Sequence, residues 1–170
     1  GADPAMFAGS LLANDMGGAP LALELAKDPN AGLFGGLIVG AMMGPTIVFI
    51  IPVALGIIEK EDQKFLATGI LAGIITIPIG AFVGGLVAGF EVMMVLRNLV
   101  PIIIFAVVIA LGLLKFENAM IKGFTYFGKG VVIVITLGLA AAIVEALTGI
   151  VVIPGMKPIS EGIEIVGDIA

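Results

Sequence analysis

Residues 11–20 read Leu-Leu-Ala-Asn-Asp-Met-Gly-Gly-Ala-Pro, a polar and glycine-rich break inside otherwise apolar sequence. A helix cannot easily continue across Gly17, Gly18 and Pro20, because glycine permits left-handed turns and proline lacks a backbone donor. A second short helix can begin at the proline, which is favoured at the first helical position. We therefore predict that residues 1–27 form a broken or re-entrant helix pair.

The break holds two polar side chains, Asn14 and Asp15. An unwound joint at membrane depth persists only where it is buried in protein or lines a polar cavity. Transporters use such joints to bind substrates and ions. The alternative is a surface loop ahead of the first membrane span, with Asp15 as an ordinary cap. The local sequence leaves both interpretations open.

The composition indicates an integral membrane protein. The chain is 60% hydrophobic and 12% charged, whereas soluble domains carry about 25% charged residues. It contains neither cysteine nor histidine, which excludes disulfides, thiol nucleophiles, histidine bases and the usual zinc sites. We therefore expect that the protein is not an enzyme and that it binds neither a cofactor nor a metal ion. The net charge of −5 argues against nucleic-acid binding, which needs a basic patch.

Long apolar segments predict an all-α, polytopic architecture, because about 20 apolar residues cross a bilayer as a helix. The four expected spans cover residues 31–58, 65–90, 99–114 and 130–154, and residues 160–170 resemble the start of a further helix. Charged residues between 115 and 129 are expected to form a connector. Since the chain begins with glycine and closes on an incipient helix, we expect residues 1–170 to be one transmembrane domain taken from a longer chain.

A row of glycines follows the break. Gly32, Gly36, Gly40 and Gly44 recur at every fourth residue and so line one face of the first span. Small residues in this spacing let helix backbones approach closely in lipid. We interpret the row mainly as a packing surface; the alternative is a substrate path.

Three polar residues within the spans are further candidates for function. Glu145 lies among apolar residues, and an intramembrane carboxylate is a functional hypothesis by default, here as a ligand or proton carrier. Its alternatives are a place near the outer end of the span or a packing contact with another helix. Thr46 and Thr76 are secondary candidates, and each is expected to bond its own helix backbone.

Several motifs resemble the ethanolamine-utilisation permease family. They are Met-Phe-Ala-Gly-Ser-Leu-Leu-Ala-Asn-Asp-Met-Gly-Gly at residues 6–18, Gly-Ala-Met-Met-Gly-Pro-Thr-Ile-Val-Phe-Ile-Ile-Pro-Val-Ala-Leu-Gly-Ile-Ile-Glu at 40–59, and shorter matches at 71–80 and 84–88. The resemblance implies a larger polytopic protein that takes up ethanolamine across the bacterial cytoplasmic membrane for use as a carbon and nitrogen source. The match to the family's motif is best from Asp15 to Gly18, whereas the resemblance assigns no role to Glu145.

Together, the break and the resemblance suggest a substrate site. Ethanolamine is a small ammonium alcohol, so Asp15 could bind the cation and Asn14 the hydroxyl. Gly17 and Gly18 would shape the turn, and carbonyls freed near Ala13 would add negative charge. Alternatives are a cation channel or ion-coupled subunit using intramembrane carboxylates and, less favoured, a membrane enzyme. Expected partners are the lipid bilayer and either the remaining helices of the parent chain or a second copy.

Overall fold

The computed structural model describes residues 1–59 and 61–154, and this part of the chain contains helices and no strand. It separates into two compact units, Gly1–Lys129 and Gly130–Ala170, which are described individually. The predicted all-helical class is thereby confirmed. The helix expected at residues 160–170 lies outside the described residues.

The first unit begins with two short helices that form a hairpin. These are α1 (Ala5–Leu11) and α2 (Gly18–Leu25), joined through the 3₁₀ turn η1 (Asn14–Met16). Asp3, before α1, accepts hydrogen bonds from the backbone N–H groups of Lys27 and Asp28, after α2. The two helices are therefore antiparallel, and residues 3–28 are called the N-terminal hairpin. With 7 and 8 residues, each helix is only about 10–12 Å long, far short of a bilayer crossing.

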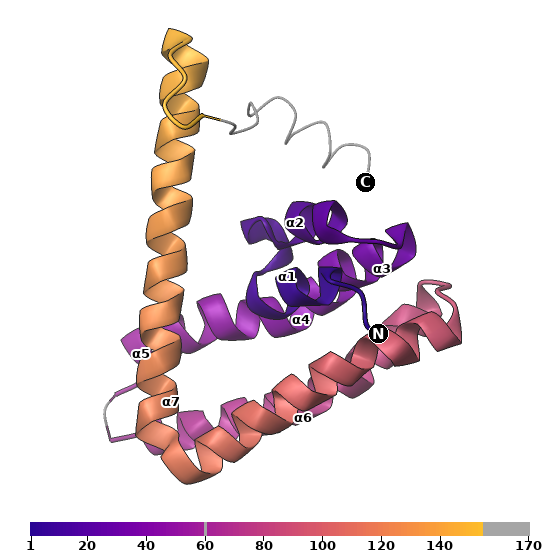
Figure 1. The fold of residues 1–170 in the computed structure, drawn as a ribbon. Coiled ribbons are helices and arrows are strands. Elements are labelled where there is room, and N and C mark those ends of the chain that lie inside the picture. Colours follow the sequence, from indigo (N-terminus) through magenta and orange to yellow (C-terminus); the bar gives the residue numbers. More distant parts are fainter. Residues whose placement is uncertain (60, 155–170) are drawn as a thin grey trace. The chain divides into compact units, whose positions relative to one another are not determined.

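A long helical segment, Pro29–Ile57, follows and is called the first long helix. Its successive parts are α3 (Pro29–Leu33), η2 (Phe34–Val39), α4 (Gly40–Pro45), η3 (Thr46–Ile50) and α5 (Ile51–Ile57), where η2 and η3 have π-helical bonding. Prolines lack the backbone donor of a regular α-helix, and the wider turn η3 lies between Pro45 and Pro52. The N-terminal hairpin packs on this helix (Figure 1).

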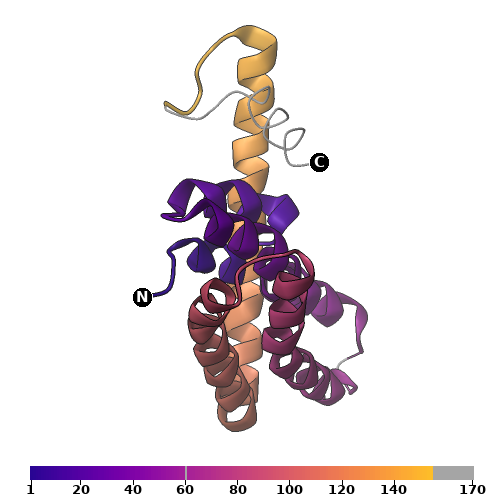
Figure 2. The same ribbon diagram turned by 90° about the vertical axis from the view of Figure 1, so that its right-hand side faces the viewer.

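The helices α6 (Gln63–Val87) and α7 (Val92–Thr148) are joined by a short turn (Figure 2). Gly89 has a φ of 83°, and its N–H bonds the Leu86 carbonyl while the Phe90 N–H bonds the Gly85 carbonyl. This pairing is a Schellman motif, which satisfies the last carbonyls of a helix and favours glycine at the left-handed position. The Phe90 ring then meets Phe34 of the first long helix edge to face, with centroids 6.1 Å apart.

The third expected span lies within α7, and the fourth begins within α7 and extends past its end at Thr148. Residues 115–129, expected to be a connector, are helical within α7, which is interrupted only by the non-helical angles of Phe116 (φ −136°, ψ 42°). Lysines, glutamate, alanine and methionine in this region are compatible with a helix, so their charges do not end it. The kink at Phe116 divides α7 into two helical stretches, so its 57 residues are not one continuous helix.

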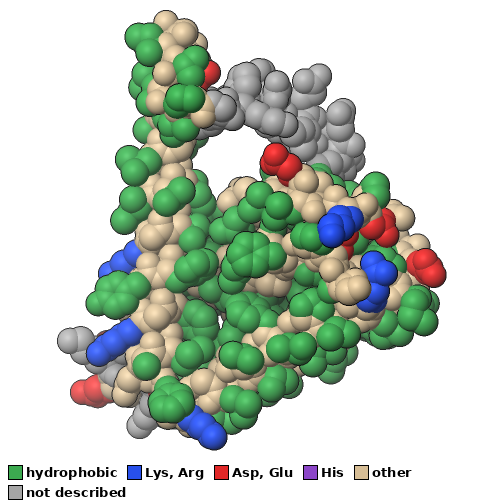
Figure 3. Space-filling model, in the orientation of Figure 1, with side chains coloured by type: hydrophobic (Ala, Val, Ile, Leu, Met, Phe, Trp, Pro, Cys, Tyr) green, Lys and Arg blue, Asp and Glu red, His purple; other side chains and the backbone are tan. Residues whose placement is uncertain are grey.

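The helices differ in how many of their large apolar side chains are buried. The largest fully buried side chains include Phe34, Met43, Ile47 and Ile51 of the first long helix. Many large apolar side chains of α6 and α7 are exposed, although Ile74, Ile102 and Ile109 of these helices are fully buried, and hydrophobic side chains are spread over the face in Figure 3. Three helices in the described part of the chain are long and apolar enough to cross a membrane. An exposed apolar surface of this extent is typical of a membrane protein.

Candidate functional site

The glycine row of the first long helix forms the seat of the N-terminal hairpin. A Cβ added to Gly36 would lie 3.0 Å from the Ala19 Cα atom, and one added to Gly40 would lie 3.5 Å from the Asn14 Cβ atom. A Cβ on Gly44 would overlap the backbone of Leu12. The hairpin therefore lies almost backbone to backbone on the helix, which confirms the packing interpretation of the row.

The tip of the hairpin brings together Asn14, Asp15, Gly17 and Gly18. The Asn14 Oδ1 atom accepts a hydrogen bond of 2.9 Å from the Asp15 N–H. The Asp15 side chain is exposed, and no donor within residues 1–59 and 61–154 bonds its carboxylate. Gly17 adopts a left-handed conformation with a φ of 88° and has open space at its Cβ position. The tip thus presents a carboxylate that is available to a cation.

The carbonyl of Ala13 does not take the expected role. It accepts hydrogen bonds from the backbone N–H groups of Met16 at 3.0 Å and Gly18 at 2.9 Å. The left-handed Gly17 folds the chain back onto this oxygen, as in a helix C-terminal cap. The Ala13 carbonyl is therefore occupied within the turn, and a contribution from the other carbonyls at the end of α1 stays a prediction.

The base of the hairpin holds a second carboxylate, Asp3, which sequence reasoning missed. Its Oδ1 atom accepts from the Ala5 N–H at 2.9 Å, and its Oδ2 atom accepts from the Lys27 and Asp28 N–H groups at 3.0 and 3.1 Å. Only 5% of Asp3 is exposed. The available signal was Asp3-Pro4, since aspartate before proline is typical of a helix start, although this pattern does not predict the bonds to α2's end.

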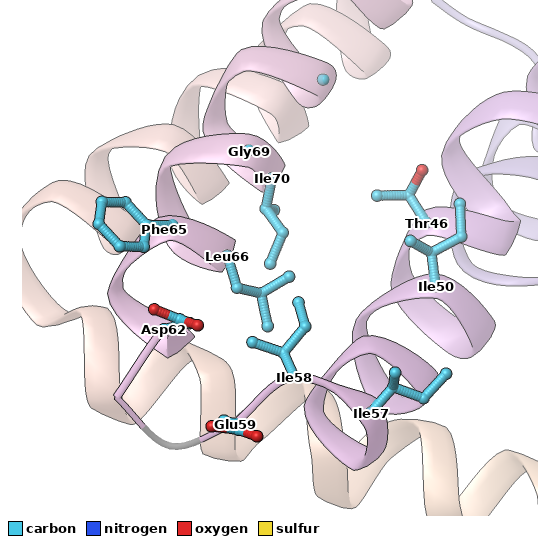
Figure 4. A pocket seen from close by; sticks show the side chains of 11 residues that line it. Thr46, Ile50, Ile57, Ile58, Glu59, Asp62, Phe65, Leu66, Gly69 and Ile70 are labelled. Atoms are coloured by element: carbon cyan, nitrogen blue, oxygen red, sulfur yellow. The ribbon is translucent and has the colours of Figure 1, made fainter.

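The two candidate threonines bond their own helices, as expected. The Thr46 Oγ1 atom donates to the Met42 carbonyl at 2.8 Å, and the Thr76 Oγ1 atom donates to the Gly73 carbonyl at 2.7 Å. Thr46 also lines an open groove of about 920 Å³ between the first long helix and α6, whose loop end carries Glu59 and Asp62 (Figure 4). Among the described residues, neither threonine is hydrogen-bonded to the hairpin.

Glu145 belongs to the second unit, where it lies in the last turns of α7. Its Oε2 atom is buried and has no hydrogen-bond partner among the residues that the structure describes. An unpaired buried carboxylate oxygen is costly, so Glu145 keeps its standing as a candidate for binding a cation or a proton.

These features define the class. Three helices in the described part of the chain are long and apolar enough to cross a membrane, and they are accompanied by a short helical hairpin, which is the architecture of an integral membrane protein. The particular family follows from comparison with known proteins. The family model described as "Ethanolamine utilisation protein, EutH" matches residues 1–170. The chain belongs to this family.

Curated bacterial relatives agree with that assignment. The chain is 68% identical over its full length to "Probable ethanolamine permease EutH" of Listeria monocytogenes, and covers 46% of that protein. It is 55% identical to the Escherichia coli protein with the same name, over 94% of the chain and 42% of the relative. It is also 55% identical over its full length to "Uncharacterized protein YxeR" of Bacillus subtilis, again covering 46% of it. The chain thus spans less than half the length of these relatives. No solved structure matches it.

Proposed function

We propose that the protein containing this chain is a transporter that takes up ethanolamine across the bacterial cytoplasmic membrane, and is not an enzyme. The names of the relatives from Listeria monocytogenes, Escherichia coli and Salmonella typhimurium support the substrate. The observation that carries the site is the unpaired Asp15 carboxylate at the tip of a hairpin. A membrane transporter places its substrate at such interruptions because backbone and side-chain polar groups are available there.

The chemistry of the tip fits a small ammonium alcohol. The Asp15 carboxylate would accept hydrogen bonds from the ammonium group, which are stronger than those between neutral groups. The Asn14 Oδ1 atom is already bonded to the Asp15 N–H, so its amide NH₂ would donate to the substrate hydroxyl. Gly17 leaves open space beside these groups, and Gly18 supports the turn. Asp15 would thus bind the ammonium group of ethanolamine, and Asn14 would bind its hydroxyl group.

The remaining candidates have secondary places in this proposal. Thr46 lines the groove beside α6, and a hydroxyl that donates to its own helix still has acceptor capacity. Thr76 is exposed on α6 and would offer the same capacity to a passing ammonium. The remaining helices of the parent chain, or a second copy, would enclose these residues within the bilayer.

A second candidate function follows from Glu145. Its buried Oε2 atom, which has no partner within the described residues, favours a cation channel or an ion-coupled subunit in which intramembrane carboxylates carry protons or sodium. A channel passes ions whether or not ethanolamine is present. A large conductance in the absence of ethanolamine, measured on the full-length protein in planar bilayers, would favour this function over a permease.

The decisive experiment compares two carboxylates of the same hairpin in the full-length protein. Asp15→Asn removes the charge that would bind the ammonium, whereas Glu24→Gln makes the same chemical change on the exposed face of α2. Hydrogen bonds to charged groups contribute about 1.5–3 kcal/mol, so Asp15→Asn should raise the KM for radiolabelled ethanolamine uptake roughly tenfold to hundredfold. Glu24→Gln should leave it unchanged.

Membrane expression is measured for both variants, so that uptake is compared per molecule of protein. Normal uptake by Asp15→Asn at normal expression would overturn the proposed site. Equal losses in both variants would also contradict it, because they would indicate a general effect of charge on the hairpin.

A further inference from the structure

Asn98 is a fully buried polar residue on α7, with an exposed fraction of 0%. Its polar neighbours Glu91 and Arg97 are exposed. The Asn98 amide Nδ2 contacts the Met94 sulfur at 3.2 Å within its own helix, whereas its Oδ1 atom accepts a hydrogen bond of 2.7 Å from the Asp3 N–H. A single side chain thus joins α7 to a residue that lies 95 positions away in the chain.

Asp3 extends this link to both arms of the N-terminal hairpin. Its carboxylate holds the start of α1 through the Ala5 N–H, and the segment after α2 through the Lys27 and Asp28 N–H groups. Buried polar networks in which every donor is satisfied hold one arrangement, because any other arrangement leaves a buried group unpaired. The base of the hairpin therefore has one preferred position relative to Asn98.

Next to this link, α1 and α7 stand apart. A mostly apolar cavity of about 500 Å³ lies between them, lined on one side by Phe7 and Leu11 and on the other by Pro101 and Phe105. The Asn98–Asp3 bond therefore lies at the edge of this open space, where it is the hydrogen bond between α7 and the base of the hairpin. Side-chain packing along α1 cannot replace it where the cavity lies.

The tip of the hairpin has no comparable tether. The hydrogen bonds of Asn14, Met16 and Gly18 within the described residues all stay inside the hairpin, and the contacts with Gly40 and Gly44 are van der Waals contacts. The tip lies about 10 Å from the base, given the length of α1. The tip is thus held by packing on the glycine row, whereas the base is held by directed hydrogen bonds.

We propose that Asn98 is a positioning residue that acts through Asp3 to place the hairpin tip, and with it Asp15, for substrate binding. This inference rests on the function proposed above. Asn98 itself does not contact the substrate. Asn98 sets the position of the Asp15 carboxylate, which contacts the substrate, and it links α7 to the binding site of the hairpin.

The test uses the full-length protein and the absence of cysteine from residues 1–170. Any cysteine in the rest of the protein is replaced by serine, and Met16→Cys then reports on the tip through its rate of labelling by a membrane-impermeant maleimide. Asn98→Leu removes the acceptor at similar side-chain volume. Thr125→Val is the matched control, since it removes a hydroxyl of α7 that bonds only its own helix, at the Ile121 carbonyl.

Asn98→Leu is expected to change the labelling rate and to raise the KM for ethanolamine, each by about fivefold or more, since loss of a hydrogen bond to a buried group alters an equilibrium by that order. Thr125→Val should change neither. Asn98→Gln keeps an uncharged amide oxygen that can accept from the Asp3 N–H and should restore labelling to within about twofold of the parent. This variant keeps the proposal testable if Asn98→Leu does not fold.

Three outcomes would overturn the positioning role: unchanged labelling in Asn98→Leu, equal changes in Thr125→Val, or labelling in Asn98→Gln that matches the leucine variant. Protection of the Met16→Cys thiol by ethanolamine separates this proposal from the previous one. If ethanolamine does not slow labelling in the protein with native Asn98, the proposed substrate site is wrong, while the effect of Asn98 on labelling still tests the tether.

Discussion

The N-terminal hairpin carries one carboxylate at its base and one at its tip, and their surroundings differ completely. Asp3 is 5% exposed and accepts three backbone hydrogen bonds. Asp15 is exposed, and the described part of the chain offers its carboxylate no donor. A carboxylate whose oxygens are occupied by backbone N–H groups stabilises the fold, whereas one with free oxygens is available to a ligand.

The residues that follow each aspartate explain the difference. Pro4 begins a helix directly after Asp3, so the free N–H of Ala5 points at the carboxylate. After Asp15, the left-handed Gly17 turns the chain back, and the Gly18 N–H bonds the Ala13 carbonyl. The same residue type thus becomes a structural clamp in one place and a candidate ligand in the other.

The largest effect is expected from breaking the base. In Asp3→Asn, one oxygen becomes an NH₂ group, so at least one buried N–H donor loses its acceptor whichever way the amide is turned. The remaining hydrogen bonds also lose the assistance of the charge. We expect the free energy of unfolding of the purified full-length protein to fall by about 3 kcal/mol, as measured by denaturant titration in mixed micelles.

Asp28→Asn is the matched control for this prediction. Asp28 also precedes a proline, and its Oδ1 atom accepts from the Asn30 N–H at 2.9 Å. Asparagine caps a helix about as well as aspartate, so the change should stay within about 0.5 kcal/mol. Similar destabilisation by both substitutions would refute the distinction between Asp3 and an ordinary capping residue.

A smaller effect is expected where the tip meets the first long helix. A Cβ at Gly44 would overlap the Leu12 backbone and lie 2.7 Å from the Ala13 nitrogen, so Gly44→Ala must lift the hairpin from its seat. Overpacking of this kind typically costs about 1–3 kcal/mol. Both the unfolding free energy and ethanolamine uptake should fall.

The control is Gly73→Ala on α6, because no atom lies within 4 Å of a Cβ at that position. It should change stability by no more than about 0.5 kcal/mol. If Gly44→Ala proved as mild as Gly73→Ala, the close seat of the tip would be contradicted. A displaced tip with an intact base would show that the two ends of the hairpin are held independently.

Sequence predicted those features that depend on local chemistry. The break at residues 11–20, the glycine seat and the self-bonded Thr46 and Thr76 follow from backbone rules and spacing, and the structure has each of them. The bond between Asp3 and Asn98 spans 95 positions, so no periodicity or motif could reveal it. Residues 117–129 are helical after the kink at Phe116, because charge alone does not end a helix, and their role as a connector between two spans stays a prediction.

The smallest effect is expected from substitutions of Gly17, which test the backbone conformation of the tip without changing its packing. Gly17 has a φ of 88° and no atom within 4 Å of a Cβ position, so Gly17→Ala adds left-handed strain without a clash, at about 1 kcal/mol. Gly17→Asn should cost less, since asparagine tolerates this region better than other residues with a side chain. Uptake should therefore fall in the order glycine, asparagine, alanine, measured at equal membrane expression. Equal activity of all three would show that the turn is not needed to present Asp15, and it would remove the link between the backbone of the tip and its carboxylate.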